Sequence, residues 1–215
     1  MKKKTAAKTP KRRNDPVATR ENILEVAMEV FAESGLSGAR VSEIARKMRT
    51  SQRMIYYYFG DKEGLYRAIL ERAYAGIRQM ESVLELENLE PVAAMRKLVE
   101  TTLDYEERHP EFVRIVGIEN LHQARHMTDV SSLRKQNNAV VKRVEEILER
   151  GRSEGVFRKD VQALEIHMVI SALCFFRVSN RYTFKAVFGL DMTDPQVNAR
   201  HKKIICDAVI GMLVI

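Results

Sequence analysis

The sequence is poor in cysteine, which limits the kinds of site it can build. Only two cysteines occur in 215 residues, Cys174 and Cys206, and each lies alone in an apolar, helix-like segment. Zinc sites and disulfide frameworks need cysteines at short, paired spacings, and that pattern is absent. We therefore expect two buried free thiols.

Long apolar runs are also missing. No segment reaches the roughly 18 apolar residues that a membrane-spanning helix needs, and no apolar signal core follows the basic N-terminus. With 45% hydrophobic residues, the chain still has ample material for a buried core. We expect a folded, cytoplasmic protein with no membrane partner.

Signatures of catalysis are absent as well. The sequence has no glycine-rich phosphate loop, no nucleophile elbow and no His-Glu-x-x-His motif. Its acidic residues lie mainly on helix faces that we expect to be solvated. The sequence therefore predicts that the chain is not an enzyme and uses no cofactor.

The net charge of +7 comes from one short segment. Seven of the 36 basic residues lie within residues 1–13, which contain no acid, and the other 29 balance the 29 acidic residues. A segment this polar cannot bury enough apolar surface to fold by itself. We expect a disordered basic arm over residues 1–13, which either contacts a polyanion such as DNA or only aids solubility.

Beyond the arm, apolar residues recur at helical spacing, and no strand-like alternation or internal repeat interrupts them. Pro16, Pro91 and Pro195 stand where helices begin, and Gly35 and Pro110 stand where helices end. The sequence therefore predicts an all-α fold, with helices over about residues 16–34, 41–48, 52–59, 61–84, 91–109, 111–126, 129–154, 161–184 and 195–215.

The stretch from Arg40 to Lys62 has the pattern of a helix-turn-helix. A short helix with an apolar inner stripe is followed by a three-residue break and by a second helix that Ser51 can cap. This stretch is basic, whereas the helix before it presents glutamates to solvent. Contact with phosphates must therefore come from this stretch.

The second helix of this motif has unusual outward residues. Helical spacing turns Ile55 and Phe59 inward and leaves Gln52, Arg53 and two of three consecutive tyrosines outside. In a major groove, arginine pairs with guanine, glutamine pairs with adenine, and tyrosine hydroxyls reach phosphates. The alternative is that the tyrosines belong to the core or to a protein interface.

The motifs ILEVAMEVFAESG, IA, IYYYF and DKEGL, between Arg20 and Leu65, resemble the DNA-binding domain of TetR-family transcriptional regulators. This segment is about the first third of the chain. The resemblance implies DNA contacts from the residues that match the family's DNA-facing positions, namely Ser42, Gln52, Arg53, Met54, Tyr56, Tyr57 and Lys62. Ser51, whose hydroxyl and neighbouring N–H groups suit a phosphate, and Tyr58 complete the predicted DNA-binding set.

Three positions depart from the family pattern. The turn glycine is replaced by Arg49, the threonine that caps the first helix of the motif by Arg40, and a common histidine by Tyr58. We expect either that Arg49 adopts a backbone conformation that non-glycine residues rarely take or that the turn differs slightly from that of the family.

The resemblance also predicts the domain organisation. An N-terminal three-helix helix-turn-helix domain over residues 14–64 would precede a helical ligand-binding and dimerisation domain over residues 65–215. The last two helices are apolar on wide faces, and in TetR-like proteins such a pair meets its copy in a four-helix interface. We expect a homodimer on palindromic DNA, with completion of the monomer core as the alternative.

Polar and aromatic side chains gather where short helices meet in TetR-like proteins, and such a mixture can orient a small, partly apolar effector. The predicted pocket residues are Tyr105, His109, Phe112, Arg114, Glu119, Asn120, His122, Met168 and Phe175. Ordinary packing or surface positions are the alternative for each.

Two of these polar residues, together with His126, suggest a second possibility. Glu119, His122 and His126 are three and four residues apart, so on one continuous helix they would share a face, as metal ligands do. Such spacing also arises by chance, and we assign no metal to it.

Together these patterns predict a homodimeric DNA-binding regulator that a small molecule releases from its operator. Regulators of the TetR type are most often repressors, and we expect a repressor here. The alternative is a helical protein-interaction module whose basic arm binds nucleic acid only nonspecifically.

Overall fold

The computed structural model describes residues 15–127 and 131–215, and the all-α prediction is confirmed there. Within these ranges the only extended pairing is an isolated bridge between Phe157 and Val214. The predicted basic arm, residues 1–13, lies outside the described residues. The helices are α1 (Pro16–Gly38), α2 (Val41–Lys47), α3 (Gln52–Phe59), α4 (Lys62–Ser82), α5 (Pro91–Arg108), α6 (Pro110–Leu121), α7 (Ser131–Ser153), α8 (Ala163–Ser179), α9 (Arg181–Phe188) and α10 (Pro195–Gly211).

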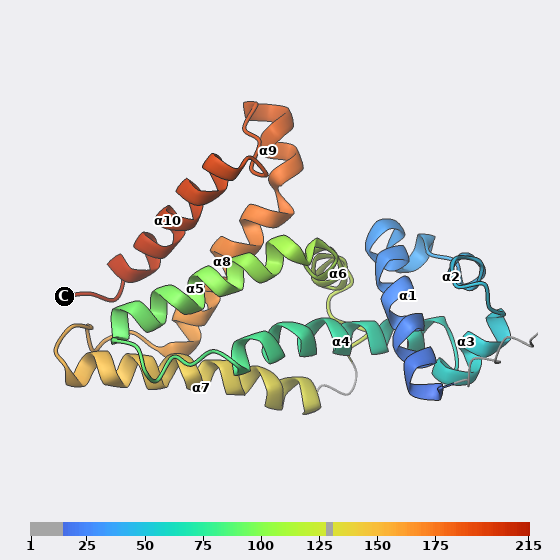
Figure 1. Cartoon of the computed structure of the whole chain (residues 1–215), viewed down its shortest axis with the longest axis horizontal. Coiled ribbons are helices and arrows are strands. Elements are labelled where there is room, and N and C mark those ends of the chain that lie inside the picture. The colour runs from blue at the N-terminus through green and yellow to red at the C-terminus, as the bar shows by residue number, and fades with distance from the viewer. Residues whose placement is uncertain (1–14, 128–130) are drawn as a thin grey trace, which may run out of the picture.

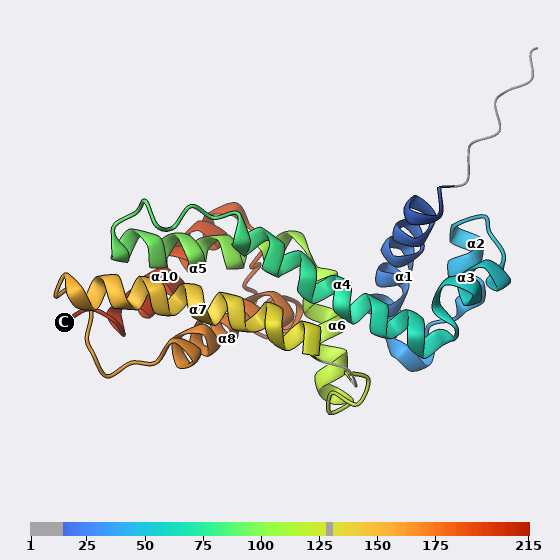
Figure 2. The same ribbon diagram turned by 90° about the horizontal axis from the view of Figure 1, so that it is seen from below.

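The molecule is elongated, and its two ends have different architectures. Figures 1 and 2 show α1, α2 and α3 as a small unit at one end, with α5, α7, α8 and α10 packed together toward the other. Helix α4 runs between them and continues unbroken past the predicted domain boundary at residue 64. The two units therefore share one helix.

Local sequence signals explain where α1 begins and bends. Asp15 Oδ1 accepts hydrogen bonds from the backbone N–H groups of Val17 (2.9 Å) and Ala18 (3.3 Å), and Pro16 occupies the first turn. Gly35 has a φ of 66°, as a helix-ending glycine should, and the last turn of α1 follows this kink. Helix α1 packs against α4 and α6, so it joins the small unit to the rest.

The start of α4 lies unusually close to the end of α3. A Cβ atom on Gly64 would lie 2.1 Å from the backbone oxygen of Phe59, so no larger residue fits without movement. Asp61 Oδ1 caps α4 by accepting a hydrogen bond from Gly64 N (2.6 Å), and Leu65 and Ile69 are fully buried behind it. The orientation of α3 is thereby fixed to α4.

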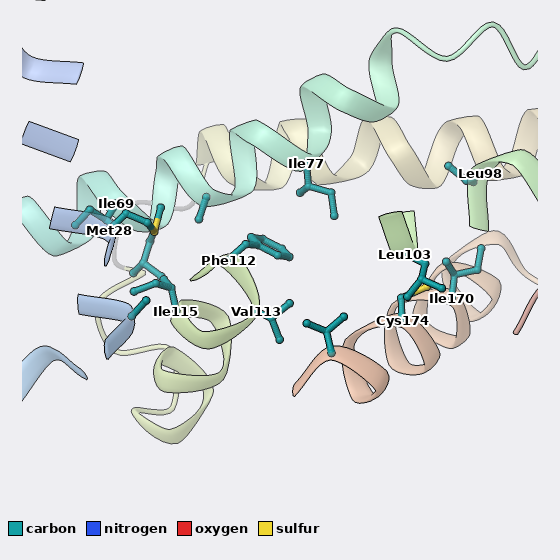
Figure 3. Close-up of a cluster of buried hydrophobic side chains, with 14 of the residues drawn as sticks. Met28, Ile69, Ile77, Leu98, Leu103, Phe112, Val113, Ile115, Ile170 and Cys174 are labelled. Carbon is teal, nitrogen blue, oxygen red and sulfur yellow. The ribbon is translucent and has the colours of Figure 1, made fainter. Parts of the chain in front are cut away.

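The core of the larger unit is built from α4, α5, α6, α7, α8 and α10. In Figure 3 the side chains of Ile77 from α4 and Phe112 from α6 point toward one another, and Leu103, Ile170 and Cys174 gather where α5 meets α8. Both cysteines of the chain are buried free thiols, as predicted.

The predicted helix over residues 161–184 is wrong, because the chain breaks at Asn180. Helix α8 ends at Ser179 and α9 starts at Arg181, with a bend of 59° between them. The Asn180 side-chain amide donates a hydrogen bond to the Phe176 carbonyl (3.1 Å), and such bonds compete with continuation of a helix. No single helix among the described residues is long and apolar enough to cross a membrane.

Candidate nucleic-acid interface and effector cavity

Helices α2 and α3 form the predicted helix-turn-helix. The turn closes through hydrogen bonds from Arg49 N to the Arg46 carbonyl (3.1 Å) and from Thr50 N to the Ala45 carbonyl (2.9 Å). Arg49 has a φ of 54°, which confirms that it takes the conformation usually given to glycine. Arg40 stands at the N-cap of α2 and makes no side-chain capping bond.

Ser51 caps α3, and the N-terminus of this helix, which is the positive end of its dipole, lies at the surface. Its Oγ accepts a hydrogen bond from the Met54 N–H (3.3 Å), as the sequence predicted. The remaining N–H groups of the first turn and the helix dipole favour an anion at this end.

The face of α3 that points away from the core carries the predicted DNA-reading residues. Ile55 is fully buried and anchors the helix, whereas Tyr57 is 80% exposed and Tyr56 is 41% exposed. Gln52 and Arg53 are exposed beside them. The remaining predicted residues frame this face: Ser42 and Ser51 are exposed, and Met54, Tyr58 and Lys62 are half-buried.

The cations around α3 are free of acidic partners. Arg40, Arg46, Lys47, Arg49 and Arg53 are all exposed, and within the described residues none of them forms an ion pair. Many arginines elsewhere in the chain form ion pairs with acidic residues. One example is Arg72 on α4, which pairs with Glu21 on α1. The surface around α3 is therefore unneutralised and suits a phosphate backbone.

The predicted pocket residues do not all line one cavity. Phe112, Asn120, Met168 and Phe175 line a cavity of about 370 Å³ enclosed by α4, α5, α6, α7 and α8. The other predicted pocket residues lie outside this lining.

Three predicted pocket residues face other hollows. Tyr105 and His109 stack with ring centroids 4.4 Å apart and line a separate hollow of about 680 Å³ beside the acidic face of α1. Arg114 donates to the hydroxyl of Tyr182 (3.1 Å) and lines a third hollow, between α1, α6 and α8. Phe112 borders both the 680 Å³ hollow and the 370 Å³ cavity, and Phe175 borders both the third hollow and the 370 Å³ cavity, whereas Tyr105, His109 and Arg114 are not among the residues that line the 370 Å³ cavity.

The predicted helix over residues 111–126 is wrong, and Glu119, His122 and His126 therefore do not share one helical face. Helix α6 ends at Leu121, and Gln123 and Ala124 have positive φ values of 58° and 57°. The chain turns because Glu119 accepts hydrogen bonds from both the backbone N–H and ring Nδ1–H of His126, each at 2.9 Å. Among the described residues no group of three such side chains is arranged to hold a metal ion.

Glu119 and His126 instead form a buried contact with the start of α4. The His126 ring meets the Tyr66 ring edge-on, with centroids 5.3 Å apart, and Tyr66 is completely buried. Burial and the nearby Glu119 raise the pKa of Tyr66. His122 lies at the end of α6 with its ring 5.5 Å from that of His126, and it is not among the residues lining the 370 Å³ cavity.

Sequence analysis missed the charged residues of the cavity. Arg78 and Glu81 from α4, Glu106 from α5 and His167 from α8 all line it. Arg78 Nη1 lies 2.6 Å from Glu81 Oε2, and both glutamates are only 3% exposed. Their helical spacing resembles that of solvated charges, so the only sequence signal was their position beside apolar stripes.

Burial changes the protonation of these groups. Desolvation raises the pKa of Glu81 to about 7, although Arg78 opposes the shift, and it raises the pKa of Glu106 to about 8. Desolvation lowers the pKa of His167 to about 4, so its imidazole is neutral at physiological pH. The cavity therefore holds one arginine cation against two carboxyl groups.

Comparison with known families gives the same assignment at both ends of the chain. Residues 23–69 match the family described as bacterial regulatory proteins, tetR family, and residues 91–209 match the family described as tetracyclin repressor-like, C-terminal domain. The first match contains most of α1, all of α2 and α3, and the start of α4. The second contains every helix from α5 to α10 except the last two residues of α10.

Individual relatives agree with these matches. The chain is 39% identical to the HTH-type transcriptional repressor NicS of Pseudomonas putida over 93% of its own length and 94% of that protein. A bacterial regulatory protein in the tetR family from Rhodococcus RHA1 has the same fold, with a TM-score of 0.70, 17% identity and coverage of 91% and 96% of the two chains.

A third similar protein was solved with its ligands. The structure of AibR in complex with isovaleryl coenzyme A and operator DNA superposes with a TM-score of 0.65 at 18% identity, covering 91% of this chain and 97% of that one. The helix-turn-helix geometry, the two family matches and the full-length relative lead to one assignment: the chain belongs to the TetR family of DNA-binding transcriptional regulators.

Proposed function

We propose that this regulator is a repressor that binds a palindromic operator as a homodimer and leaves it when a small molecule occupies the 370 Å³ cavity. The observation that carries the proposal is the face of α3, where exposed Gln52, Arg53 and Tyr57 lie among cations that have no acidic partner. Its action on an operator places the protein in the cytoplasm. The 39% identity to a relative named as a repressor supports the direction of regulation.

An exposed apolar surface on α8 and α10 supports the homodimer. Leu164, Met168 and Phe176 on α8 are 64%, 63% and 51% exposed, Ile204 on α10 is 56% exposed, and Met212, directly after α10, is 42% exposed. A monomer rarely leaves such side chains together in water. Two copies of α8 and α10 would form a four-helix interface and set the separation of the two α3 helices.

The dimer can be tested with one charge. Ile204→Glu should convert the dimer to a monomer in light scattering, because it places an unpaired carboxylate in the apolar interface. Val83→Glu is the matched control, since Val83 is 71% exposed but lies at the end of α4. Equal dissociation of both variants, or of neither, would contradict an interface on α8 and α10.

The arrangement of α6 supports a route from the cavity to α3. Phe112 and Asn120 of α6 line the cavity, and Glu119 of the same helix holds His126 against Tyr66 at the start of α4. A ligand that moves α6 would move the start of α4, to which α3 is fixed. Release then requires that the ligand bind the two arrangements with different affinity.

Selection of bound sequences from a random DNA pool tests the proposal directly. The expected result is a palindrome whose half-sites lie about 34–36 Å apart, or a multiple of this, as two α3 helices in successive major grooves require. Arg53→Ala and Tyr57→Ala should weaken binding to the selected DNA far more than binding to random duplex. Lys159→Ala is the control, because it removes an exposed cation far from α3 in the sequence.

The alternative of a helical interaction module makes the opposite prediction. If binding is nonspecific, the selection yields no palindrome. Arg53→Ala and Lys159→Ala then weaken binding to DNA by the same factor, whatever the sequence of the duplex. Either result would overturn the proposed function.

A further inference from the structure

Glu106 is the most unusual group in the cavity. Its side chain is 3% exposed, and its Oε2 atom has no hydrogen-bond partner within the described residues. A buried carboxyl group without partners costs stability, whether it stays ionised or takes up a proton. A feature that costs stability and points into a cavity suggests that a ligand supplies the missing partner.

The charged and titratable groups around Glu106 do not supply that partner. Arg78 on α4 pairs with Glu81 through Nη1, and its buried Nε has no hydrogen-bond partner within the described residues, so it makes no bond to Glu106. Burial raises the pKa of Tyr74 on the same helix, so its hydroxyl adds no charge. His167 on α8 is neutral, and the Cys174 thiol on that helix is kept protonated because burial raises its pKa. Among the residues that the structure describes, α6 and α7 contribute only asparagine amides to the polar lining.

This balance of charge distinguishes between ligand classes. An anion would meet two carboxyl groups and one arginine whose Nη1 atom already lies 2.6 Å from Glu81 Oε2. A cation would pair with an ionised Glu106 and neutralise its charge. Electrostatics therefore favours a ligand that brings a positive charge and N–H donors.

Much of the remaining cavity lining is apolar. Ile77, Phe112, Val116, Met168 and Phe175 contribute aliphatic and aromatic surface, and the volume of about 370 Å³ lies toward the small end of ligand sites. Aromatic rings also attract cations at close range. A ligand that matches both Glu106 and the apolar part of the lining carries one charged nitrogen on a compact apolar body.

We propose that the effector is a small organic cation, a primary amine or a protonated nitrogen heterocycle on an apolar body, whose charged nitrogen pairs with Glu106. This inference rests on the proposed function, since it names the ligand class of the same cavity. Binding the cation ionises Glu106, and the proton passes to the solvent.

Three probes of similar shape test the charge. Benzylamine is cationic at neutral pH, benzyl alcohol is neutral and benzoate is anionic. In calorimetric titration of the full-length protein, benzylamine should bind in a saturable manner and at least about tenfold more tightly than the other two. Because the pKa of Glu106 is raised to about 8, titration in buffers of different ionisation enthalpy should show nearly one proton released per site.

Glu106→Gln keeps the size of the side chain and removes its charge. This variant should weaken benzylamine binding by roughly 30-fold or more and abolish proton release. Glu146→Gln is the matched control, since its side chain is 61% exposed on α7. A folded Glu106→Gln protein that keeps benzylamine affinity, benzoate binding as tight as that of benzylamine, or no saturable benzylamine binding would overturn the inference.

The same preparations separate this inference from the proposed function. Fluorescence anisotropy on the selected operator, without any probe, reports DNA binding alone. If the protein binds the operator specifically but does not bind benzylamine, only the proposed ligand class is wrong. If the unmodified protein does not bind an operator specifically, the proposed function is wrong, whatever the result with the probes.

Discussion

Replacing Glu106 by glutamine should make the stability of the protein less sensitive to pH. Burial is the main cause that raises the pKa of Glu106 from 4.5 to about 8, and the neighbouring Glu81 adds to it against the opposing Arg78. The unfolded chain therefore loses this proton at lower pH than the folded one. Below the pKa that Glu106 has in the unfolded chain, Glu106 does not lower the unfolding free energy. As pH rises from there toward the pKa that Glu106 has in the folded protein, the unfolding free energy falls.

The size of the effect follows from the two values. Between them each pH unit costs about 1.4 kcal/mol of unfolding free energy. Allowing for partial titration near the unfolded value, the unmodified protein should lose about 2.5 kcal/mol through Glu106 between about pH 5 and about pH 7. Glutamine does not ionise, so the variant escapes this loss. Glu81 titrates in both proteins, and its contribution largely cancels in the difference.

Urea unfolding followed by helical circular dichroism measures this difference. Both proteins are compared at one protein concentration, because dimerisation links stability to concentration. The quantity of interest is the change in the variant-minus-wild-type free energy between the two pH values, since any fixed cost of burying the glutamine amide cancels. Glu146→Gln should show no such change. A difference for Glu106→Gln that stays constant with pH would refute the reasoning.

Three further predictions concern the DNA-binding end and its junction. Arg49→Gly should raise the unfolding free energy by about 0.5–1 kcal/mol, because Arg49 has a φ of 54°; Arg49→Ala should give no such gain, and equal gains would contradict backbone strain. Tyr57→Ala should weaken operator binding at least about tenfold yet shift stability by under about 0.5 kcal/mol, since the ring is 80% exposed; a large loss of stability would place the ring in the core. Glu119→Gln should lower stability by about 1–3 kcal/mol in thermal unfolding, because the carboxylate accepts two hydrogen bonds from His126; an unchanged melting temperature would show that this contact is dispensable.

The helix-turn-helix could be predicted from the sequence because its signals are local. The cap by Ser51, the anchor at Ile55 and the exposed Tyr57 depend on residues within two helical turns of one another. The backbone of Arg49 follows from the length of the turn. Such features are set by the chain itself and need no distant partner.

The ends of helices with competing side chains were harder to predict. Asn180 stops α8 through a bond to its own helix, in a segment whose apolar pattern continues past it. Glu119 stops α6 by binding His126, seven residues later. In both places a side-chain hydrogen bond competes with the helical pattern, and apolar periodicity does not register it.

By itself the sequence determined the fold class, the helix-turn-helix motif and the cap of α3, because these depend on neighbours along the chain. Only the tertiary structure decided that Arg78, Glu81, Glu106 and His167 share one cavity. These residues come from three helices and have the spacing of solvated charges. A glutamate on a helix becomes a buried, unpartnered acid only when other helices close over it, and that closure is a property of packing.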